Sequence, residues 1–233
     1  MEIVIILVFA ALIIGLAIAS YYQKRARQDA LAKLAARHGW QYRSDNDELL
    51  EAQFGAFDCL HKGDCRYAFN VLSGSMSSGT ANRRAICGFD YHYETYSTDS
   101  KGNRETHHHY FSAMTLSVPW PLKPLLIRPE GFFDKVGEFF GFDDIDFESD
   151  EFSRTFFVKS PDRRWAFDVI NQATMEFLLA APRFTIDMLG PTVMAYRSTT
   201  FAPEEFEAAL AVMSGIVDRL PESVLRELGG ATR

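Results

Sequence analysis

The first 22 residues constrain the fold of this chain more than any other segment. Residues 3–19 contain no polar side chain, and Ser20, Tyr21 and Tyr22 extend the stretch to about 20 residues. An α-helix of that length covers about 30 Å, the thickness of the hydrocarbon core of a bilayer. A buried soluble helix would carry some polar face. The segment therefore predicts a transmembrane anchor with an aromatic interfacial end, represented by Ile3, Leu7, Gly15, Ala19, Tyr21 and Tyr22.

The charges that flank the apolar segment set its predicted orientation. Only Glu2 precedes it, whereas the residues that follow are basic, namely Lys24, Arg25, Arg27, Lys33 and Arg37. Because basic flanks stay in the cytoplasm, we expect a single-pass protein of the cell membrane. Its N-terminus would lie outside and every residue after Tyr22 in the cytoplasm. A cleavable signal peptide is the alternative, since Ala17-Ile18-Ala19 is similar to a cleavage site, but signal peptides begin with basic residues.

Small residues recur on one face of the predicted anchor. Ala11, Gly15 and Ala19 are spaced by four residues, and such spacing lets two membrane helices approach closely. Ala and Gly are also frequent in membrane spans that stay single. The segment therefore suggests the lipid bilayer as one partner and a second copy of the chain, in a homodimer, as another.

Composition indicates a globular domain after the anchor. The 20 Phe and 9 Tyr of the chain supply material for a sizeable core. Cys59, Cys65 and Cys87 form no CxxC pair, which is typical of buried thiols in a reducing compartment and not of a disulfide framework or a zinc site. Residues 23–43 form a basic collar at the membrane surface, but the chain as a whole carries −7. An acidic body argues against nucleic acid as a partner.

The sequence predicts a helix after the anchor and then the strands that begin the domain. Leu31, Leu34 and Ala35 recur at helical spacing, and Gly39 suits the end of a juxtamembrane helix over 23–39. Alternation of β-forming residues then predicts strands that form an antiparallel meander. The further elements predicted here are a strand over 40–43, a helix over 45–52, strands over 66–72, 83–96 and 105–118, and a Gly/Ser loop over 73–82.

Prolines and helix-start residues organise the second half. Four prolines predict an extended, kinked connection over 119–130. Ser160 followed by Pro161 is typical of a helix start, with Ser160 as the N-cap. The elements predicted here are helices over 132–140, 161–171, 172–181, 203–219 and 222–228, strands over 145–147 and 153–159, and a β-hairpin of 183–189 with 192–197 across Gly190-Pro191.

These elements predict an α+β fold. Strands cluster separately from helices without a βαβ rhythm, so we expect a mainly antiparallel sheet, a meander plus a hairpin, with packed helices after one N-terminal transmembrane helix. The predicted organisation is a transmembrane anchor (1–22), a juxtamembrane helix (23–39), one globular domain (40–229) and a tail (230–233).

Histidines supply the one candidate metal site of the sequence. If Tyr96 pairs with Glu105 across the turn, one sheet face carries His92, His107 and His109 beside carboxylates. Three imidazoles can bind Zn²⁺. The alternative is a solvated strand face that is rich in histidine, since side chains on a flat sheet face diverge. The candidate metal ligands are therefore His92, His107 and His109.

Other motifs for catalysis or cofactor binding fail on spacing. No serine in the 73–79 segment has Gly at both −2 and +2, as a nucleophile elbow requires, and the segment lacks the order of a phosphate loop. The acidic run from Asp144 has Ser149 where a calcium loop needs Gly and Thr155 where it needs Glu. The sequence therefore predicts no catalytic residue and no cofactor.

The central block resembles a family of bacterial membrane-anchored domains of unknown function. The resemblance covers roughly residues 85–180. It is carried by the segments 89–93 (FDYHY), 129–130 (PE), 145–152 (IDFESDEF), 157–162 (FVKSPD) and 175–178 (MEFL). It implies a bacterial inner-membrane setting and no residue roles.

Two classes of function are therefore open at the level of sequence. The first is a tethered interaction or accessory module without a catalytic role, which binds a protein partner at the membrane. The second uses the three histidines, either in a membrane-bound metal-dependent hydrolase or in a pH-sensing module. The absence of catalytic motifs favours the first class.

Overall fold

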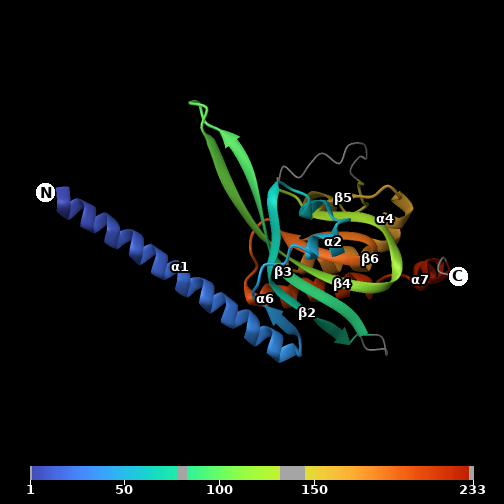
Figure 1. Ribbon diagram of the computed structural model, residues 1–233. Helices are drawn as coiled ribbons and strands as arrows, with labels where there is room; N and C mark the ends of the chain where they lie inside the picture. The colour runs from blue at the N-terminus through green and yellow to red at the C-terminus, as the bar shows by residue number, and fades with distance from the viewer. Residues whose placement is uncertain (1, 78–82, 132–144, 231–233) are drawn as a thin grey trace.

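The computed structural model describes residues 2–77, 83–131 and 145–230, apart from the side chains of residues 2–5 and 7. One continuous helix, α1 (Glu2–His38), combines the predicted anchor with the predicted juxtamembrane helix. It ends before Gly39, whose φ of +67° is the left-handed conformation expected after a helix. The N-terminal half of α1 extends away from the body, and its C-terminal half lies against it (Figure 1).

Within the described residues, no helix carries a stretch that is long and apolar enough to cross a membrane.

Four of the remaining helices, α4 to α7, follow the predictions closely, whereas α2 begins five residues later than the predicted helix over 45–52, and η1 and α3 were not predicted. Asp162, rather than the predicted Ser160, caps the helix after Pro161, because its side chain accepts the backbone N–H of Trp165. The elements are α2 (Leu50–Phe54), the 3₁₀ helix η1 (Asp58–Leu60), α3 (Asp150–Thr155), α4 (Arg163–Val169), α5 (Gln172–Ala180), α6 (Pro203–Val217) and α7 (Glu222–Gly230).

The strands confirm an α+β fold with an antiparallel sheet. Neighbours run in the order β1-β2-β3-β4-β5, and β6 pairs with the free side of β4. The meander of β2, β3 and β4 is as predicted. The described strands are β1 (Gln41–Arg43), β2 (Asp64–Ser77), β3 (Arg83–Thr98), β4 (Arg104–Pro129), β5 (Phe156–Lys159) and β6 (Thr185–Arg197).

The predicted hairpin of 183–189 with 192–197 is wrong, and so is the proline-rich connection over 119–130. The first pair of segments forms one strand, β6, and the prolines lie in the second half of β4. The pairing of the two strands shifts its register twice, between Ser117 and Leu122 and between Leu122 and Leu125. Proline is tolerated at such an irregularity because the ladder is interrupted there and its missing N–H is not required.

Smaller differences also have local causes. Residues 73–77 continue β2 instead of forming a loop, and residues 145–147 form no strand although Ile145 N–H bonds the Val158 carbonyl. The segment 153–155 belongs to α3, because the Ser149 side chain caps that helix at Phe152. The rest of the predicted loop, 78–82, and the predicted helix over 132–140 lie outside the described residues.

Two cores lie on the two faces of the sheet. The larger one gathers the buried side of α1, the stripe of α6 and the helices α4, α5 and α7, with Phe206 and Met213 fully buried. The smaller one packs α2 and η1 on the other face, around Phe89 and Tyr91. Beyond the body, the ends of β3 and β4 form a hairpin that projects toward the side where α1 emerges (Figure 1).

Candidate functional site

The carboxylate of Asp90, in the middle of β3, is the most fully bonded buried charge of the described chain. Arg27 of α1 donates Nε–H to Oδ2 at 3.0 Å and Nη2–H to Oδ1 at 2.7 Å. Asn70 of β2 and Ser112 of β4 donate to the same group, which has no solvent exposure. Three strands and α1 thus converge on one charge. Such a two-pronged pair fixes the position of the helix on the sheet.

The C-terminal half of α1 is part of the domain core. Leu31 and Leu34 are fully buried, and Arg27 Nη1 also donates to the Phe201 carbonyl. His38 contacts the carboxylate of Glu207 on α6. Arg27, which belongs to the basic collar in the sequence, therefore faces the domain and not the membrane surface.

The predicted register of the projecting hairpin is wrong by one residue. Tyr96 pairs with Thr106 and not with Glu105. Asp99 sets this register, because its side chain accepts the backbone N–H groups of Lys101 and Asn103 and its own N–H bonds the Asn103 carbonyl. Because side chains alternate along a strand, a shift of one residue moves every partner to the other face.

The structure consequently does not bring His92, His107 and His109 together. His109 stacks on Tyr93 with ring centres 4.6 Å apart and bonds the Thr95 hydroxyl. His107 bonds the Ser97 hydroxyl on that same face. His92 lies on the opposite face. The hydrolase and pH-sensor hypotheses were based on three neighbouring histidines, and these histidines lie on two different faces.

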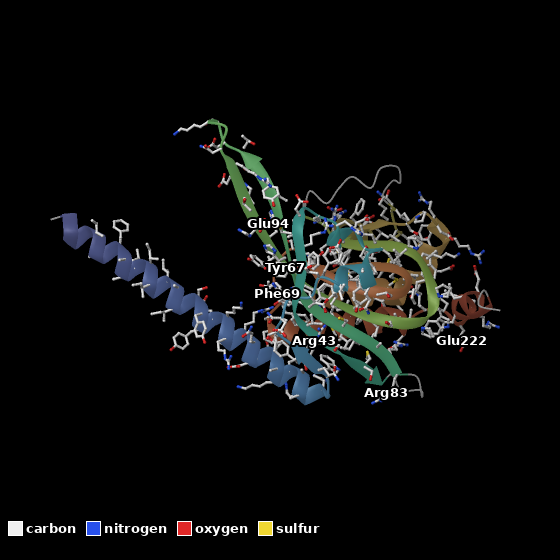
Figure 2. The ribbon with its side chains drawn as sticks, in the orientation of Figure 1. Arg43, Tyr67, Phe69, Arg83, Glu94 and Glu222 are labelled. Atoms are coloured by element: carbon white, nitrogen blue, oxygen red, sulfur yellow. The ribbon has the colours of Figure 1, made fainter. Side chains whose placement is uncertain are left out.

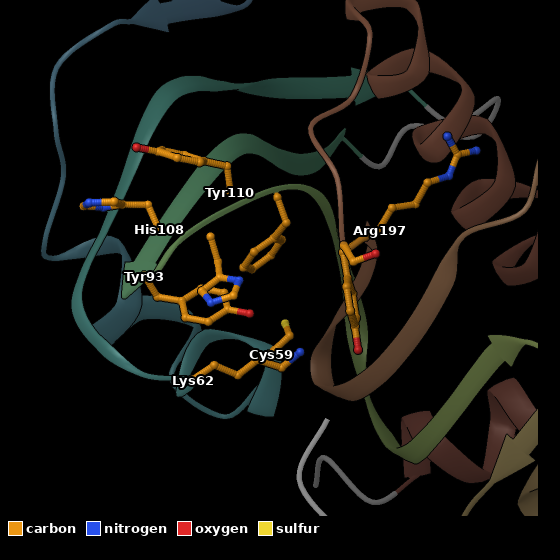
Figure 3. Close-up of a pocket in the computed structure, with 10 residues that line it drawn as sticks. Cys59, Lys62, Tyr93, His108, Tyr110 and Arg197 are labelled. Atoms are coloured by element: carbon orange, nitrogen blue, oxygen red, sulfur yellow. The ribbon is translucent and has the colours of Figure 1, made fainter. Parts of the chain in front are cut away.

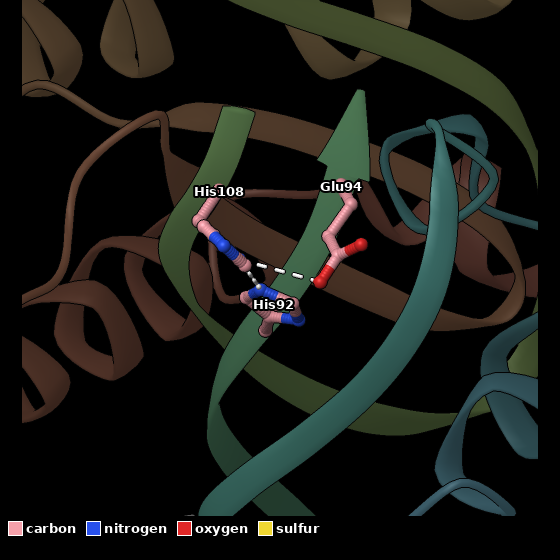
Figure 4. Close-up of side chains that lie close together, drawn as sticks. All are labelled: His92, Glu94 and His108. Atoms are coloured by element: carbon pink, nitrogen blue, oxygen red, sulfur yellow. Dashed lines mark hydrogen bonds and ion pairs between the residues drawn. The ribbon is translucent and has the colours of Figure 1, made fainter. Parts of the chain in front are cut away.

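A different trio meets on the face that carries His92. His92 Nε2 lies 3.1 Å from His108 Nδ1, and His108 Nδ1 lies 3.3 Å from Glu94 Oε1 (Figure 4). One ligand atom from each of the three residues falls within 4.8 Å of the others. We call these residues the His92–Glu94–His108 cluster. They border a shallow hollow that Cys65, Arg66, Tyr67 and Tyr110 also line.

The members of the cluster differ in how firmly they are held. His92 is 3% exposed between the rings of Tyr67 and Tyr110, whose centres are 4.6 and 4.9 Å away. Its Nδ1 lies 3.2 Å from the Cys65 carbonyl, to which it donates. Desolvation raises the pKa of Glu94, but hydrogen bonds from Tyr96 and Cys65 outweigh it, so this pKa lies below its ordinary value. The carboxylate is therefore ionised near neutrality.

Two β-bulges in β2 direct polar groups toward the His92–Glu94–His108 cluster and toward Asp90. Cys65 and Asn70 have positive φ angles of +50° and +52°, and each lies where the β2–β3 register shifts. The first bulge turns the Cys65 carbonyl to His92, and the second turns the Asn70 amide to Asp90. Non-glycine residues at positive φ are uncommon and cost energy, so they mark positions where geometry matters.

The opposite face of the hairpin borders a second hollow, of about 210 Å³. Tyr93 and Cys59 face it, whereas His108 and Tyr110 point to the other side of their strand (Figure 3). Lys62, just after η1, also lines this hollow, whereas the side chain of Arg197 in β6 points away from it, toward Glu205 of α6. Burial raises the pKa of the Cys59 thiol, which therefore stays protonated. Cys59 is a buried thiol as predicted, but Cys65 is exposed.

Asp187 of β6 borders a third hollow, of about 180 Å³, that is mainly apolar. Desolvation, and then the negative charge of Asp58, raise the pKa of Asp187 to about 7. A carboxyl whose folded pKa lies above its unfolded value makes the fold less stable as pH rises through the interval between the two. Stability is therefore lost from about pH 4 to pH 7 and then levels off.

The substitution Asp187→Asn tests this pH dependence. We expect it to raise the free energy of unfolding by about 1–3 kcal/mol at pH 8 and to leave it nearly unchanged at pH 4, because the amide has no charge to bury. Urea unfolding of the full chain in detergent at both pH values measures the effect. Asp146→Asn, at an exposed position, is the control. An equal effect of Asp187→Asn at both pH values would contradict the prediction.

Sequence reasoning missed the Arg27–Asp90 pair and the role of His108. The two partners of the pair are 63 residues apart, and no local pattern joins them. The sequence contained one indication that Asp90 has a buried partner. Asp90 is a single charge between Phe89 and Tyr91 in a strand that is otherwise apolar there. His108 was missed because the predicted register placed His107 and His109, and not His108, on the face of His92.

No family model and no curated protein matches this chain. A solved structure with a similar fold is the crystal structure of the mycobacterial trehalose monomycolate transport factor A, TtfA. The TM-score is 0.58 with 12% sequence identity, over 84% of this chain and 97% of that chain. At this identity the likeness is one of fold.

Proposed function

We propose that this chain is a membrane-tethered accessory module without a catalytic role. In this proposal, the apolar segment 1–22, which begins outside the part that the structure describes in full, spans the membrane, and the rest of α1 fixes the α+β domain at the cytoplasmic surface. There the domain binds a protein partner.

The observation that carries the proposal is the contrast between the two halves of one helix. In the N-terminal half, apolar side chains on every side of the helix are exposed, from 52% for Ile18 to 66% for Ile6. In the C-terminal half, Leu31 and Leu34 are buried in the core. Exposed apolar surface around a whole helix suits lipid and not water. Because α1 is continuous, whatever holds its first half also orients the domain.

Two further features support the tethered module. Tyr21 and Tyr22 are exposed where the apolar run ends, as an interfacial aromatic pair would be, and Lys24 and Arg25 follow immediately. The protein with the similar fold is called a transport factor, a name that suits an accessory role. Its cargo and partners are not carried over to this chain at this sequence identity.

A second copy of the chain is a further proposed partner. Ala11, Gly15 and Ala19 are exposed along α1, and a Cβ at Gly15 would meet no atom within 4 Å. The stripe is therefore free for close approach of a second membrane helix.

Fusions to the C-terminus of the full chain test the proposed orientation in a bacterium. We expect a fluorescent reporter that folds in the cytoplasm to be active in the membrane fraction, and a periplasm-dependent alkaline phosphatase to be inactive, because the basic flank of α1 stays inside. The reverse pattern of activities, or a fluorescent fusion found in the soluble fraction, would overturn the proposal.

A further inference from the structure

We propose that the His92–Glu94–His108 cluster binds a divalent transition-metal ion of the zinc type. This inference goes beyond the tethering role and does not depend on it. The site involves two residues of β3 and one of β4, at the base of the projecting hairpin (Figure 2 labels Glu94 there).

The spacing of the three ligand atoms matches a zinc site. Two atoms that are each about 2.1 Å from a tetrahedral ion lie about 3.4 Å from one another. The His92 Nε2–His108 Nδ1 distance is 3.1 Å and the His108 Nδ1–Glu94 Oε1 distance is 3.3 Å. All three ligand atoms lie within 4.8 Å of one another, so an ion could bind once a side chain closes the remaining gap. His108, whose side chain is 53% exposed, has the room to make this movement.

The surroundings of His92 prepare it as a ligand. Its Nδ1–H donates to the Cys65 carbonyl, so the neutral ring has its lone pair on Nε2, directed at the cluster. A metal-binding histidine characteristically donates its other N–H to a carbonyl or carboxylate in this way. The β-bulge in β2 at Cys65, whose φ is +50°, directs the Cys65 carbonyl at the His92 ring. The rings of Tyr67 and Tyr110 restrict the movement of the imidazole.

The donor set decides the class of ion. Two imidazoles and one carboxylate suit zinc and its neighbours, whereas Ca²⁺ and Mg²⁺ prefer all-oxygen sites. Three protein ligands leave a fourth position, which faces the hollow beside Arg66 and Tyr67. The Nδ1 of His92 is already occupied by the Cys65 carbonyl, so its Nε2 needs no change of partner on that side to bind an ion.

The hairpin provides a matched set of controls on its other face. His107 and His109 lie on the same strand as His108 but point to the opposite side, where they bond Ser97 and Thr95. Non-specific binding by a histidine-rich hairpin would depend on all of them alike. Binding by the cluster depends on His108 alone among the three.

Titration of the full chain in detergent with Co²⁺, followed by visible absorption, tests the proposal. We expect one Co²⁺ per chain with a tetrahedral spectrum, displaced by Zn²⁺. His108→Ala and Glu94→Gln should each weaken binding at least about 100-fold. His107→Ala and His109→Ala should each change it less than about threefold.

Three results would overturn the proposal: a wild-type chain that binds no Co²⁺, equal affinities of the wild type and His108→Ala, or an equal loss in His107→Ala. Circular dichroism of His108→Ala verifies that this exposed substitution leaves the fold intact. Because the titration needs no bilayer, its failure would leave the membrane proposal untouched, and failure of the fusions would leave the metal site untouched.

Discussion

Asp90→Ala is expected to lower the free energy of unfolding of the full chain by about 3–5 kcal/mol, the usual cost of removing one partner from a buried ion pair. Asp90 is fully buried and accepts hydrogen bonds from Arg27, Asn70 and Ser112. Its removal leaves the donors of Arg27, Asn70 and Ser112 without their acceptor, and it leaves the Arg27 guanidinium without its counter-charge. Because Arg27 belongs to α1, the same change should loosen the helix on the domain.

Urea unfolding in detergent, followed by tryptophan fluorescence, measures this loss, since Trp40 and Trp165 are buried. Asp29→Ala is the matched control, because Asp29 faces Arg25 in an exposed pair on the same helix. An exposed pair of this kind contributes at most about 1 kcal/mol. If Asp90→Ala cost no more than Asp29→Ala, the account of how α1 is fixed to the sheet would be wrong.

The double substitution Leu12→Asp and Ile13→Asp is expected to release the chain from membranes. Each acidic side chain near the centre of a membrane helix costs about 2.5–3.5 kcal/mol, so the pair costs about 5–7 kcal/mol. Both positions are exposed on α1, at 56% and 64%, so no contact within the domain is lost. Alkaline carbonate extraction measures the change: the wild type should stay in the pellet and the variant should move to the supernatant.

The control places the same charges on the other half of the helix. Ala32 and Ala36 are exposed on the part of α1 that lies against the domain. Ala32→Asp with Ala36→Asp should leave extraction unchanged, because these positions face water in the proposed arrangement. A wild type that is extracted by carbonate, or a Leu12 and Ile13 variant that is retained, would count against a span in α1.

Local patterns predicted those parts of the fold that depend on neighbours in the sequence. The end of α1 at Gly39 and the helix predicted over 203–219, which is α6, are specified by local residues, and both are confirmed. The strand β3 and the first half of β4 follow from alternation over a few residues. Such features need no knowledge of distant segments.

What the sequence did not reveal depends on distant partners or on one residue of register. Three prolines of β4, Pro119, Pro121 and Pro124, lie where the pairing with β6 shifts its register, and their compatibility with a strand depends on that distant partner. The polar face of the hairpin depends on the turn at Asp99, and moving it by one residue exchanges His107 and His109 for His108. The Arg27–Asp90 pair joins segments that no local pattern connects. Each error arose where tertiary pairing, and not local preference, decided the outcome.

The depth of α1 in a bilayer tests the central claim most directly. In a Cys65→Ser background, single spin labels at Leu16 and at Ala36 of the full chain in liposomes would report access to oxygen and to a water-soluble relaxation agent. We expect the Leu16 label to lie in hydrocarbon and the Ala36 label in water, because α1 is one helix with an exposed apolar half and a half that lies against the domain. A Leu16 label as accessible to the water-soluble agent as the Ala36 label would contradict the account.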